Sequence, residues 1–386
     1  MLQSLSVKDQ VVAEPTPATT LVRRLRSLAV PALARMYLPQ EKLFVFRLRL
    51  TSEGIVAEGV SRRYTAITLM GLAGEEQDTV SAVLAGDSMH DVCARLVRDV
   101  ASSDNLGDVA LLLWTTQMVG YSDSSLVRKR LFELQPAERA YPVVELAWAL
   151  SALCGDKDPS SDPVREALAA RLLREFGPIS GVFPHLAGER LTGLRSHVAC
   201  FADLVYPVQA LSFYLQLTGN SKARDAALRC AELFCEKQGS EGQWWWHYDW
   251  RTGDVIEPYP VYAVHQDAMA PMALFALSDA TGHDFSPYIE KGLDWLRQSS
   301  ELGGGSLIDD DVTMIWRKVA RREPRKMTRT LQALASRLHP RLRAPGLDIM
   351  FPVGAVDYED RPYHLGWLFY AWPASRLAQW EEVEAR

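Results

Sequence analysis

The segments YPVVELAWALSALCG (141–155) and YPVQALSFYLQLTG (206–219) repeat one pattern at an interval of about 65 residues. Each is followed by a polar break and then by an Ala- and Leu-rich segment, at 164–177 and 223–239. Apolar residues recur every three or four positions in both halves, which is the period of an amphipathic helix and not of a strand. Each repeat therefore predicts a helical hairpin.

A third copy starts with YPVYAVHQD at Tyr259, and its second half covers 281–298. The pattern places Pro142, Pro207 and Pro260 at the first position of a helix, where proline costs no hydrogen bond. It places Gly155, Gly219 and Gly282 at helix ends, where a left-handed residue is favoured. Weaker hairpin patterns occur at 64–99, 107–135 and 326–380.

Hairpins of fixed period bury their apolar faces against their neighbours, as a solenoid or as a closed ring. The long loops with functional residue types all follow a second helix, which favours a ring with these loops at one end. We therefore expect an all-α fold, an α/α toroid of about six helical hairpins. Alternating apolar residues at 44–59 predict a short N-terminal β element. Residues 1–40 are expected to form a partly flexible N-terminal extension, and 41–386 a single toroid domain.

The composition describes a globular protein with a large core, 48% hydrophobic and 23% charged. A net charge of -6 argues against a dedicated nucleic-acid partner. The five cysteines have neither CxxC nor zinc spacing and suggest reduced thiols. Neither a signal peptide nor a membrane-spanning run is evident, so we expect a cytoplasmic location.

The segment QGSEGQWWWHYDWRTGDVIEPYPVYAVHQD (238–267) joins two helical patterns and holds four Trp. Loops are normally polar, so this many large rings should line a pocket, although packing between hairpins is an alternative. Aromatic faces beside carboxylates and imidazoles suit a sugar, or a carbocation held over a ring. We expect the rings and polar groups that contact substrate to be Trp244, Trp245, His247, Tyr259, Trp316, Arg317, Arg62 and His364.

Glycan chemistry needs one neutral acid and one ionised base or nucleophile across the sugar. The candidates for these catalytic roles are Asp249, Glu257, His265, Asp267, Asp309, Asp310 and Asp311. Asp267 stands near a helix start, so capping is the competing explanation for it. His185, His197 and Asp203 form a further polar group that ion pairs at hairpin ends would also explain.

The run Asp309–Asp311 repeats like charges that need solvent, a partner or a cation. No cofactor is expected, and a divalent cation at these three residues is the alternative to an acidic loop paired with Arg317. Residues 317–343 carry ten Lys and Arg against one Glu. This segment would contact an anionic ligand or a membrane surface, or else form a solvated basic helix face.

Leu233, Phe234, Gln238, Gly242 and Trp244 resemble the QW repeat of the squalene–hopene and terpenoid cyclase superfamily, and 292–307 resembles a degenerate second copy. The plan is also similar to six-hairpin glycosidases and uronyl epimerases. The resemblance implies a toroid. The acid motif DxDD and the diphosphate motif DDxxD of terpenoid cyclases are both absent near 307–314.

We therefore expect a carbohydrate-active enzyme that cleaves, eliminates or epimerises within a glycan, with an oligosaccharide or other small, possibly anionic substrate. One alternative is a terpenoid cyclase-like enzyme acting on an isoprenoid, which predicts an apolar cavity. The other is a non-catalytic toroid that binds a partner, which predicts carboxylates that point apart.

Overall fold

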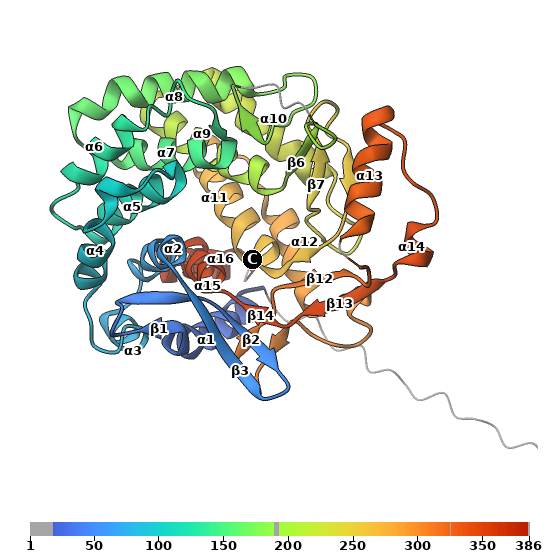
Figure 1. The fold of residues 1–386 in the computed structure, drawn as a ribbon, viewed down its shortest axis with the longest axis horizontal. Helices are drawn as coiled ribbons and strands as arrows, with labels where there is room; N and C mark the ends of the chain where they lie inside the picture. The colour runs from blue at the N-terminus through green and yellow to red at the C-terminus, as the bar shows by residue number, and fades with distance from the viewer. Residues whose placement is uncertain (1–17, 189–192, 325, 385–386) are drawn as a thin grey trace, which may run out of the picture.

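The computed structural model describes residues 18–188, 193–324 and 326–384. Six inner helices pack side by side in chain order, and the last packs against the first, which closes a ring (Figure 1). This confirms the predicted α/α toroid and excludes a solenoid for the described chain. The inner helices are α2 (Arg62–Leu72), α5 (Leu106–Val119), α7 (Val143–Gly155), α9 (Ala202–Thr218), α11 (Ala270–Thr281) and α15 (Pro362–Ala371).

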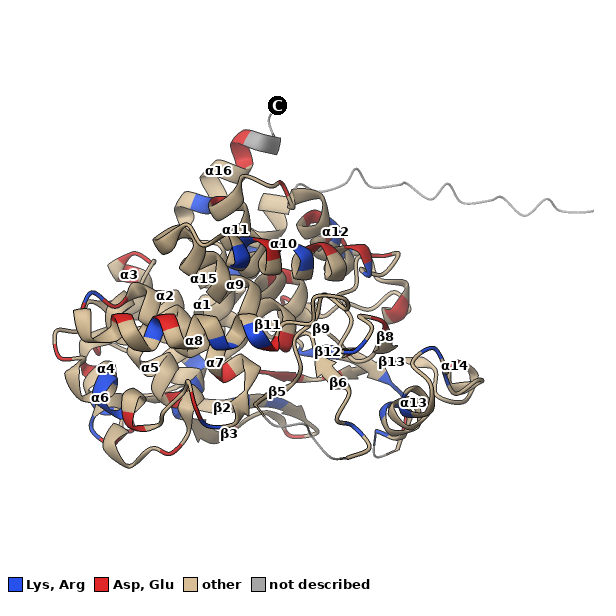
Figure 2. Cartoon of the chain, turned by 90° about the horizontal axis from the view of Figure 1, so that it is seen from above, with Lys and Arg blue, Asp and Glu red and all other residues tan. Residues whose placement is uncertain are grey.

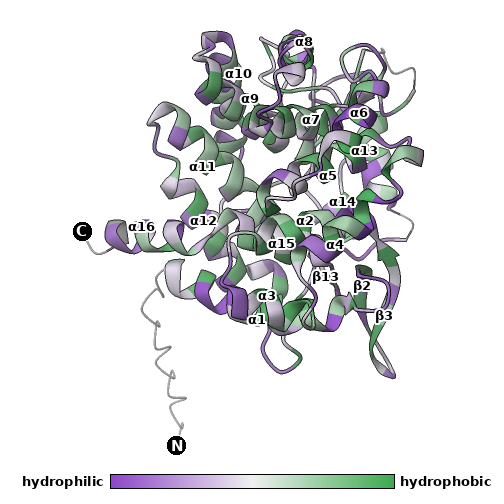
Figure 3. Ribbon diagram, turned by 90° about the vertical axis from the view of Figure 1, so that its left-hand side faces the viewer, coloured by the Kyte–Doolittle hydropathy of each residue, from purple (hydrophilic) through white to green (hydrophobic). Residues whose placement is uncertain are grey.

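A single π-helical turn, η3 (His265–Met269), leads into α11 and lies against α15. Outer helices flank the ring and carry more polar surface than the inner ones, as α6 and α16 do in Figure 3. They are α3 (Gln77–Val83), α4 (Met89–Val97), α6 (Ser125–Glu133), α8 (Asp162–Glu175), α10 (Ser221–Glu236), α12 (Ser286–Arg297) and α16 (Ala374–Glu384).

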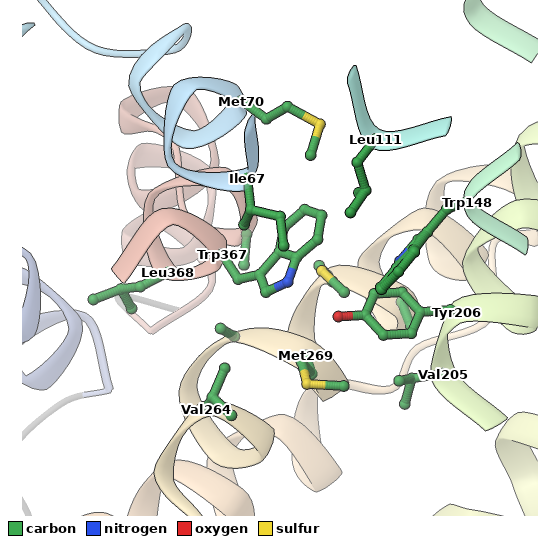
Figure 4. Packing of buried hydrophobic residues seen from close by; sticks show 14 of the residues in the cluster. Ile67, Met70, Leu111, Trp148, Val205, Tyr206, Val264, Met269, Trp367 and Leu368 are labelled. Atoms are coloured by element: carbon green, nitrogen blue, oxygen red, sulfur yellow. The ribbon is translucent and has the colours of Figure 1, made fainter. Parts of the chain in front are cut away.

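Large apolar side chains fill the interior of the ring. Ile67 and Met70 of α2, Leu111 of α5 and Trp148 of α7 point toward Trp367 of α15 in the close view of Figure 4. All five are buried, and Tyr206 of α9 packs on both indole rings at centroid distances of 5.1 and 6.0 Å. The ring is therefore a packed core, so a ligand must bind at one of its ends.

The ring closes through two glycines. A Cβ atom on Gly71 of α2 would lie 2.2 Å from the carbonyl oxygen of Gly366 in α15, and one on Gly366 would lie 2.7 Å from Cα of Thr68. Only residues without a side chain allow this approach of two backbones. The Thr68 hydroxyl also donates to the Pro362 carbonyl at 3.2 Å.

The caps of the hairpins agree only partly with the sequence pattern. Gly219 and Gly282 are left-handed, with φ of 70° and 77°, as expected. Gly155 is instead the last residue of α7, where an added Cβ atom would come too close to the side chain of Gln117. Pro207 lies inside α9, because the helix already begins at Ala202, and Pro260 precedes a strand rather than a helix.

Short strands lie in the segments that connect the helices of the ring. The predicted β element is present as the hairpin β2 (Leu43–Thr51) and β3 (Gly54–Ser61), with Phe44 and Leu48 buried. It shares a sheet with β1 (Tyr37–Leu38) and β14 (Glu359–Asp360). The other strands are β4 (Tyr141–Pro142) with β5 (Leu186–Ala187), β6 (Val198–Cys200) with β7 (His247–Asp249) and β8 (Val255–Glu257), β9 (Val261–Tyr262) with β12 (Lys318–Arg321) and β13 (Val353–Asp357), and β10 (Ile308–Asp309) with β11 (Met314–Ile315).

The segment assigned from sequence to an N-terminal extension contains α1 (Ala18–Met36), which packs on α12, α15 and α16. Its apolar side chains, such as Leu25 and Leu33, are fully buried. Residues 18–40 thus form part of the folded body, and residues 1–17 lie outside the described chain. The remaining helices are η1 (Val100–Ser102), η2 (Pro159–Ser161), η4 (Ser300–Leu302), α13 (Met327–Leu338) and α14 (Leu347–Met350).

Candidate active site

A cavity of about 680 Å³ lies beside β6 and β7. Its wall includes two histidines, two arginines, a cysteine and an indole, a mixture that suits a polar ligand. We call these residues, with Asp203, Glu145 and Arg63 next to them, the mouth cluster. Those that line the cavity are His185, Arg195, Cys200, Trp246, His247 and Arg329.

His247 is the residue of the mouth cluster that was predicted from sequence to contact substrate. It stands opposite Cys200 in the β6–β7 pair, and its Nε2 lies 3.4 Å from Nη2 of Arg195. Burial and then the charges of Arg195 and Arg329 hold the pKa of His247 well below its usual range. Its imidazole is therefore neutral at pH 7 and able to accept a proton.

His185 and Asp203 form an ion pair across the start of α9. Nδ1 of His185 lies 3.1 Å from both carboxylate oxygens of Asp203, and the Cys200 amide donates to Oδ2 at 2.7 Å. The hydrogen bond that the imidazole donates to Asp203 raises the pKa of His185. Asp203 is fully buried, whereas the His185 side chain is 52% exposed and faces the cavity.

Glu145 lies in the first turn of α7, next to His185. The Val143 amide donates to the His185 carbonyl at 3.0 Å, which fixes this helix start to the rim of the cavity. Burial raises the pKa of Glu145, and the nearby Arg63 opposes that effect from 3.7 Å. Arg63 also lies 5.4 Å over the ring of Trp148. Burial thus makes the charged form of Glu145 less favourable than it is in water.

Two arginines that line the cavity, Arg195 and Arg329, have no ion-pair partner among the described residues. Each charge helps to depress the pKa of His247. Figure 2 shows the basic residues of β12 and α13 on the side of the molecule that carries β6. An anionic group on a ligand would therefore be attracted to this cavity.

The other tryptophans of 238–267 are packing residues. Trp244 is fully buried between Phe201 and Phe234, at centroid distances of 5.8 and 5.5 Å. Trp245 packs edge-on against Tyr259, whose hydroxyl donates to Glu301. The structure therefore places Trp244, Trp245 and Tyr259 away from the cavity, and Trp246 is the indole that lines it.

Two of the predicted catalytic carboxylates each form an ion pair with an arginine. Both oxygens of Asp249 accept from Arg251, at 2.9 and 2.7 Å. Glu257 accepts from Nε of Arg321 at 2.7 Å, and its Oε2 has no hydrogen-bond partner. Burial raises the pKa of Glu257 despite this arginine. Neither carboxylate lines the cavity of the mouth cluster.

A second group of titratable side chains is buried where η3 packs on α15. His364 Nε2 is 2.9 Å from both oxygens of Asp267, and neither residue reaches solvent. Burial raises the pKa of Asp267, and the pKa of Asp360 in the same region is raised to about 6. His265 is buried between the rings of Phe201 and Trp246, at centroid distances of 4.7 and 5.3 Å.

Asp309 ends β10, and Asp310 and Asp311 follow it in the turn before β11, away from the residues that line the cavity. Asp309 accepts from Trp316 Nε1 at 3.1 Å, and Asp310 forms an ion pair with Arg24 of α1. Among the described residues, the side chains that lie close enough together to hold a metal ion do not include these three aspartates.

The remaining predicted contacts also have structural partners. Arg62 pairs with Asp99 at 2.9 Å, and Trp316 is buried against Tyr358. Arg317 pairs with Glu359 at 2.6 Å and lies 5.1 Å over Tyr262. In the basic segment 317–343, Arg337 binds Ser196 at 3.0 Å. No described helix is both long enough and apolar enough to cross a membrane.

A second cavity, of about 720 Å³, lies near Trp250. Several of its polar groups have partners: Arg251 with Asp249, Arg337 with Ser196, and His197 with the Ser336 hydroxyl at 2.8 Å. The mouth cluster differs because two of its arginines and one exposed imidazole edge remain available. We therefore place the candidate active site there and not in the larger cavity.

The position of His265 gives a testable pH dependence. Burial lowers its pKa from 6.5 to about 3. Since the folded pKa lies below the unfolded one, the contribution of neutral His265 is complete above pH 6.5 and is lost as the pH falls toward 3. We expect this contribution to the free energy of unfolding to be roughly 3 kcal/mol smaller at pH 4 than at pH 7.

Urea unfolding at pH 7, 5 and 4 measures this effect as the difference between wild type and His265→Phe. Other titrating groups are common to both proteins and cancel in that difference. His90→Gln, at an exposed histidine, should follow the wild type at every pH. A wild-type minus His265→Phe difference that does not change with pH would contradict the assignment.

The sequence pattern missed Glu145 as a site residue and treated His185 and Asp203 as hairpin ion pairs. One signal was present: all three lie within a few residues of a YPV start or of the loop that precedes it. What the pattern lacked was the pairing of β4 with β5 and of β6 with β7, which brings these positions together.

No family model and no curated protein matches the sequence. Solved structures do share its fold. An unsaturated glucuronyl hydrolase specific for heparin has a TM-score of 0.62 at 10% identity, over 96% of this chain and 98% of that one. The unsaturated glucuronyl hydrolase from Bacillus sp. GL1 has a TM-score of 0.55 at 12% identity, over 94% and 97%. The cellobiose 2-epimerase from Bacillus thermoamylovorans has a TM-score of 0.59 at 11% identity, over 91% and 98%. At these identities the similarity shows a shared six-hairpin toroid fold.

Proposed function

We propose that the chain is a carbohydrate-active enzyme that cleaves, eliminates or epimerises within an acidic glycan bound at the mouth cluster. The observation that carries the proposal is that one cavity is lined by imidazole, guanidinium and indole side chains, with the pKa of His247 lowered there and the pKa of nearby Glu145 raised. A raised pKa makes Glu145 a better proton donor than a free carboxylate would be, and a lowered pKa keeps His247 unprotonated at neutral pH.

The two groups belong to one electrostatic neighbourhood. The charge of Glu145 raises the pKa of His185, and the charge of His185 in turn lowers that of His247. In the proposal, Glu145 protonates an oxygen of the sugar and His247 removes a proton from carbon or from water. Trp246 supplies a ring face to the sugar, and Arg195 and Arg329 hold its anionic group.

The cavity composition favours a sugar over an isoprenoid. A terpenoid cation needs a pocket whose walls are mainly apolar. Leu194, Val198 and Ala199 give this cavity apolar wall too, but two imidazoles and two guanidinium groups also line it. The structures that share the fold carry names of glycan-processing enzymes, which agrees with the proposal. A soluble oligosaccharide is the substrate class that fits these walls.

A non-catalytic binding module is the second candidate. The observation in its favour is that Asp249, Glu257, Asp267 and the run Asp309–Asp311 do not converge, since most of them have a separate partner. Under this candidate the mouth cluster binds an acidic glycan and performs no reaction.

The first test is thermal unfolding of the purified protein with uronate-containing and neutral oligosaccharides, and with polyprenyl diphosphates. A ligand at 100 times its dissociation constant stabilises a protein by about 2.7 kcal/mol, which shifts the melting curve measurably. We expect stabilisation by acidic oligosaccharides and not by the other two groups. Stabilisation by isoprenoids alone would contradict the proposal.

The second test is turnover of the stabilising oligosaccharide by His247→Gln and Glu145→Gln. Loss of an acid or base commonly costs on the order of 100-fold or more in rate, so kcat should fall at least about 100-fold in each variant while thermal stabilisation by the ligand persists. His90→Gln serves as the control and should keep wild-type kcat. Binding without turnover in the wild type would favour the non-catalytic candidate.

A further inference from the structure

Three side chains of different ligand type meet at the wall of the cavity. A ring nitrogen of His185, Sγ of Cys200 and a carboxylate oxygen of Asp203 all lie within 4.8 Å of one another. In a tetrahedral zinc site the bonds are about 2.0–2.3 Å, so neighbouring ligand atoms stand roughly 3.3–3.8 Å apart. The observed group therefore needs only a small inward movement to enclose a cation.

The Asp203 carboxylate is the anchor of this group. It is fully buried, and within the described residues no Lys or Arg approaches it within ion-pair distance; its charged partner is His185. The Cys200 amide fixes one of its oxygens at 2.7 Å, which orients the carboxylate toward the other two side chains. A buried carboxylate held in this way is complemented by a cation better than by solvent, which cannot reach it.

The backbone holds the three ligands on rigid elements. Cys200 ends β6, which is paired with β7, and Asp203 lies in the first turn of α9. His185 immediately precedes β5, and its carbonyl accepts from Val143 at the start of α7. Each ligand is therefore fixed by a strand pair or an inner helix, as a preorganised metal site requires.

We propose that His185, Cys200 and Asp203 bind one divalent transition-metal ion of the zinc type, with its fourth position open to the cavity. One nitrogen, one thiolate and one carboxylate suit Zn²⁺ or Co²⁺ and not Mg²⁺ or Ca²⁺, which prefer oxygen ligands alone. Three protein ligands with an open position are typical of catalytic rather than structural zinc.

Binding of the ion stands independently of the proposed function, but its use does not. If the mouth cluster processes a glycan, the open position would be available to a substrate oxygen or a water molecule in the cavity that His185, Cys200 and His247 line. His247, opposite Cys200 on β7, lies outside the three-ligand group and stays available as the acceptor.

The test is titration of untagged, chelator-treated protein with Co²⁺, followed by absorption spectroscopy. We expect saturation at one equivalent, a thiolate-to-cobalt charge-transfer band in the near ultraviolet, and visible bands of tetrahedral intensity. Cys200→Ser should remove the charge-transfer band and weaken binding at least about 10-fold. Cys235→Ser, at a buried cysteine in α10, is the matched control and should behave as wild type.

His185→Gln tests a second ligand and should also weaken Co²⁺ binding while retaining the thiolate band at high cobalt. Circular dichroism of each variant checks that the ring is intact. Absence of saturable binding in the folded wild type, or a thiolate band that survives in Cys200→Ser, would overturn the proposal.

The thermal-shift panel separates this proposal from the proposed function. Stabilisation by acidic oligosaccharides in protein that takes up no Co²⁺ would support the glycan site and refute the metal site. One equivalent of Co²⁺ at Cys200 without any response to oligosaccharides would give the reverse result.

Discussion

Gly71→Ala is expected to lower the free energy of unfolding by about 3 kcal/mol, and more if the ring cannot adjust. The added methyl group would lie 2.2 Å from the Gly366 carbonyl oxygen. Because that oxygen is a backbone atom of a packed helix, it cannot move aside as a flexible side chain could. Such overpacking commonly costs 1–3 kcal/mol where side chains can move, so a backbone contact belongs at about the upper end. The substitution lies at the junction where α15 packs against α2 and closes the ring.

Urea unfolding followed by circular dichroism measures this loss. Gly74→Ala is the matched control, because Gly74 lies in the turn just after the same helix and its nearest contact would be an ordinary 3.8 Å. That variant should stay within about 0.5 kcal/mol of wild type. Equal unfolding curves for the two variants would mean that the two helices separate without cost.

Arg321→Met is expected to cost about 3–5 kcal/mol, because it leaves the Glu257 carboxylate buried without its cation. Both side chains are almost completely buried, at 4% and 1% exposure, and Nε of Arg321 lies 2.7 Å from Oε1 of Glu257. The guanidinium also reaches Asp348 at 2.8 Å and lies over the ring of Tyr259, so some of the loss comes from those contacts.

The double variant Arg321→Met with Glu257→Gln separates the two contributions. Removing the charge of Glu257 should recover roughly half of the loss, since an uncharged amide costs less to bury than a carboxylate. Arg23→Met breaks an exposed pair with Glu381 and should cost no more than about 1 kcal/mol. A double variant no more stable than Arg321→Met would show that packing of the arginine, and not the charge of Glu257, dominates.

The helical ring was accessible from sequence because its signal is periodic. The repeated YPV segments and the left-handed glycines at 219 and 282 fix hairpins whose apolar faces must meet, and the structure confirms that outcome. The prediction that Pro207 is the first residue of a helix was wrong. Helix α9 begins before Asp203, so its first turn already extends toward the mouth cluster.

The site was less accessible because its residues lie in short irregular strands. Cys200 and His247 are neighbours only through the β6–β7 register, which spacing along the chain does not reveal. Residue type was also misleading: Asp249 and Glu257 stand among aromatic residues in the sequence, yet each turns toward an arginine in the structure. Their roles as acid or base remain predictions, and the function proposed for the mouth cluster does not require them.

The closure of the ring also has a consequence for biosynthesis. Thr68 and Pro362, which bond at the junction of α2 and α15, are 294 residues apart in the chain. At about 5–20 residues per second, a ribosome needs roughly 15–60 s to make the second partner after the first. During that interval the apolar face of α2 has no partner helix on one side, so the nascent chain offers a binding surface to chaperones until its last inner helix has emerged.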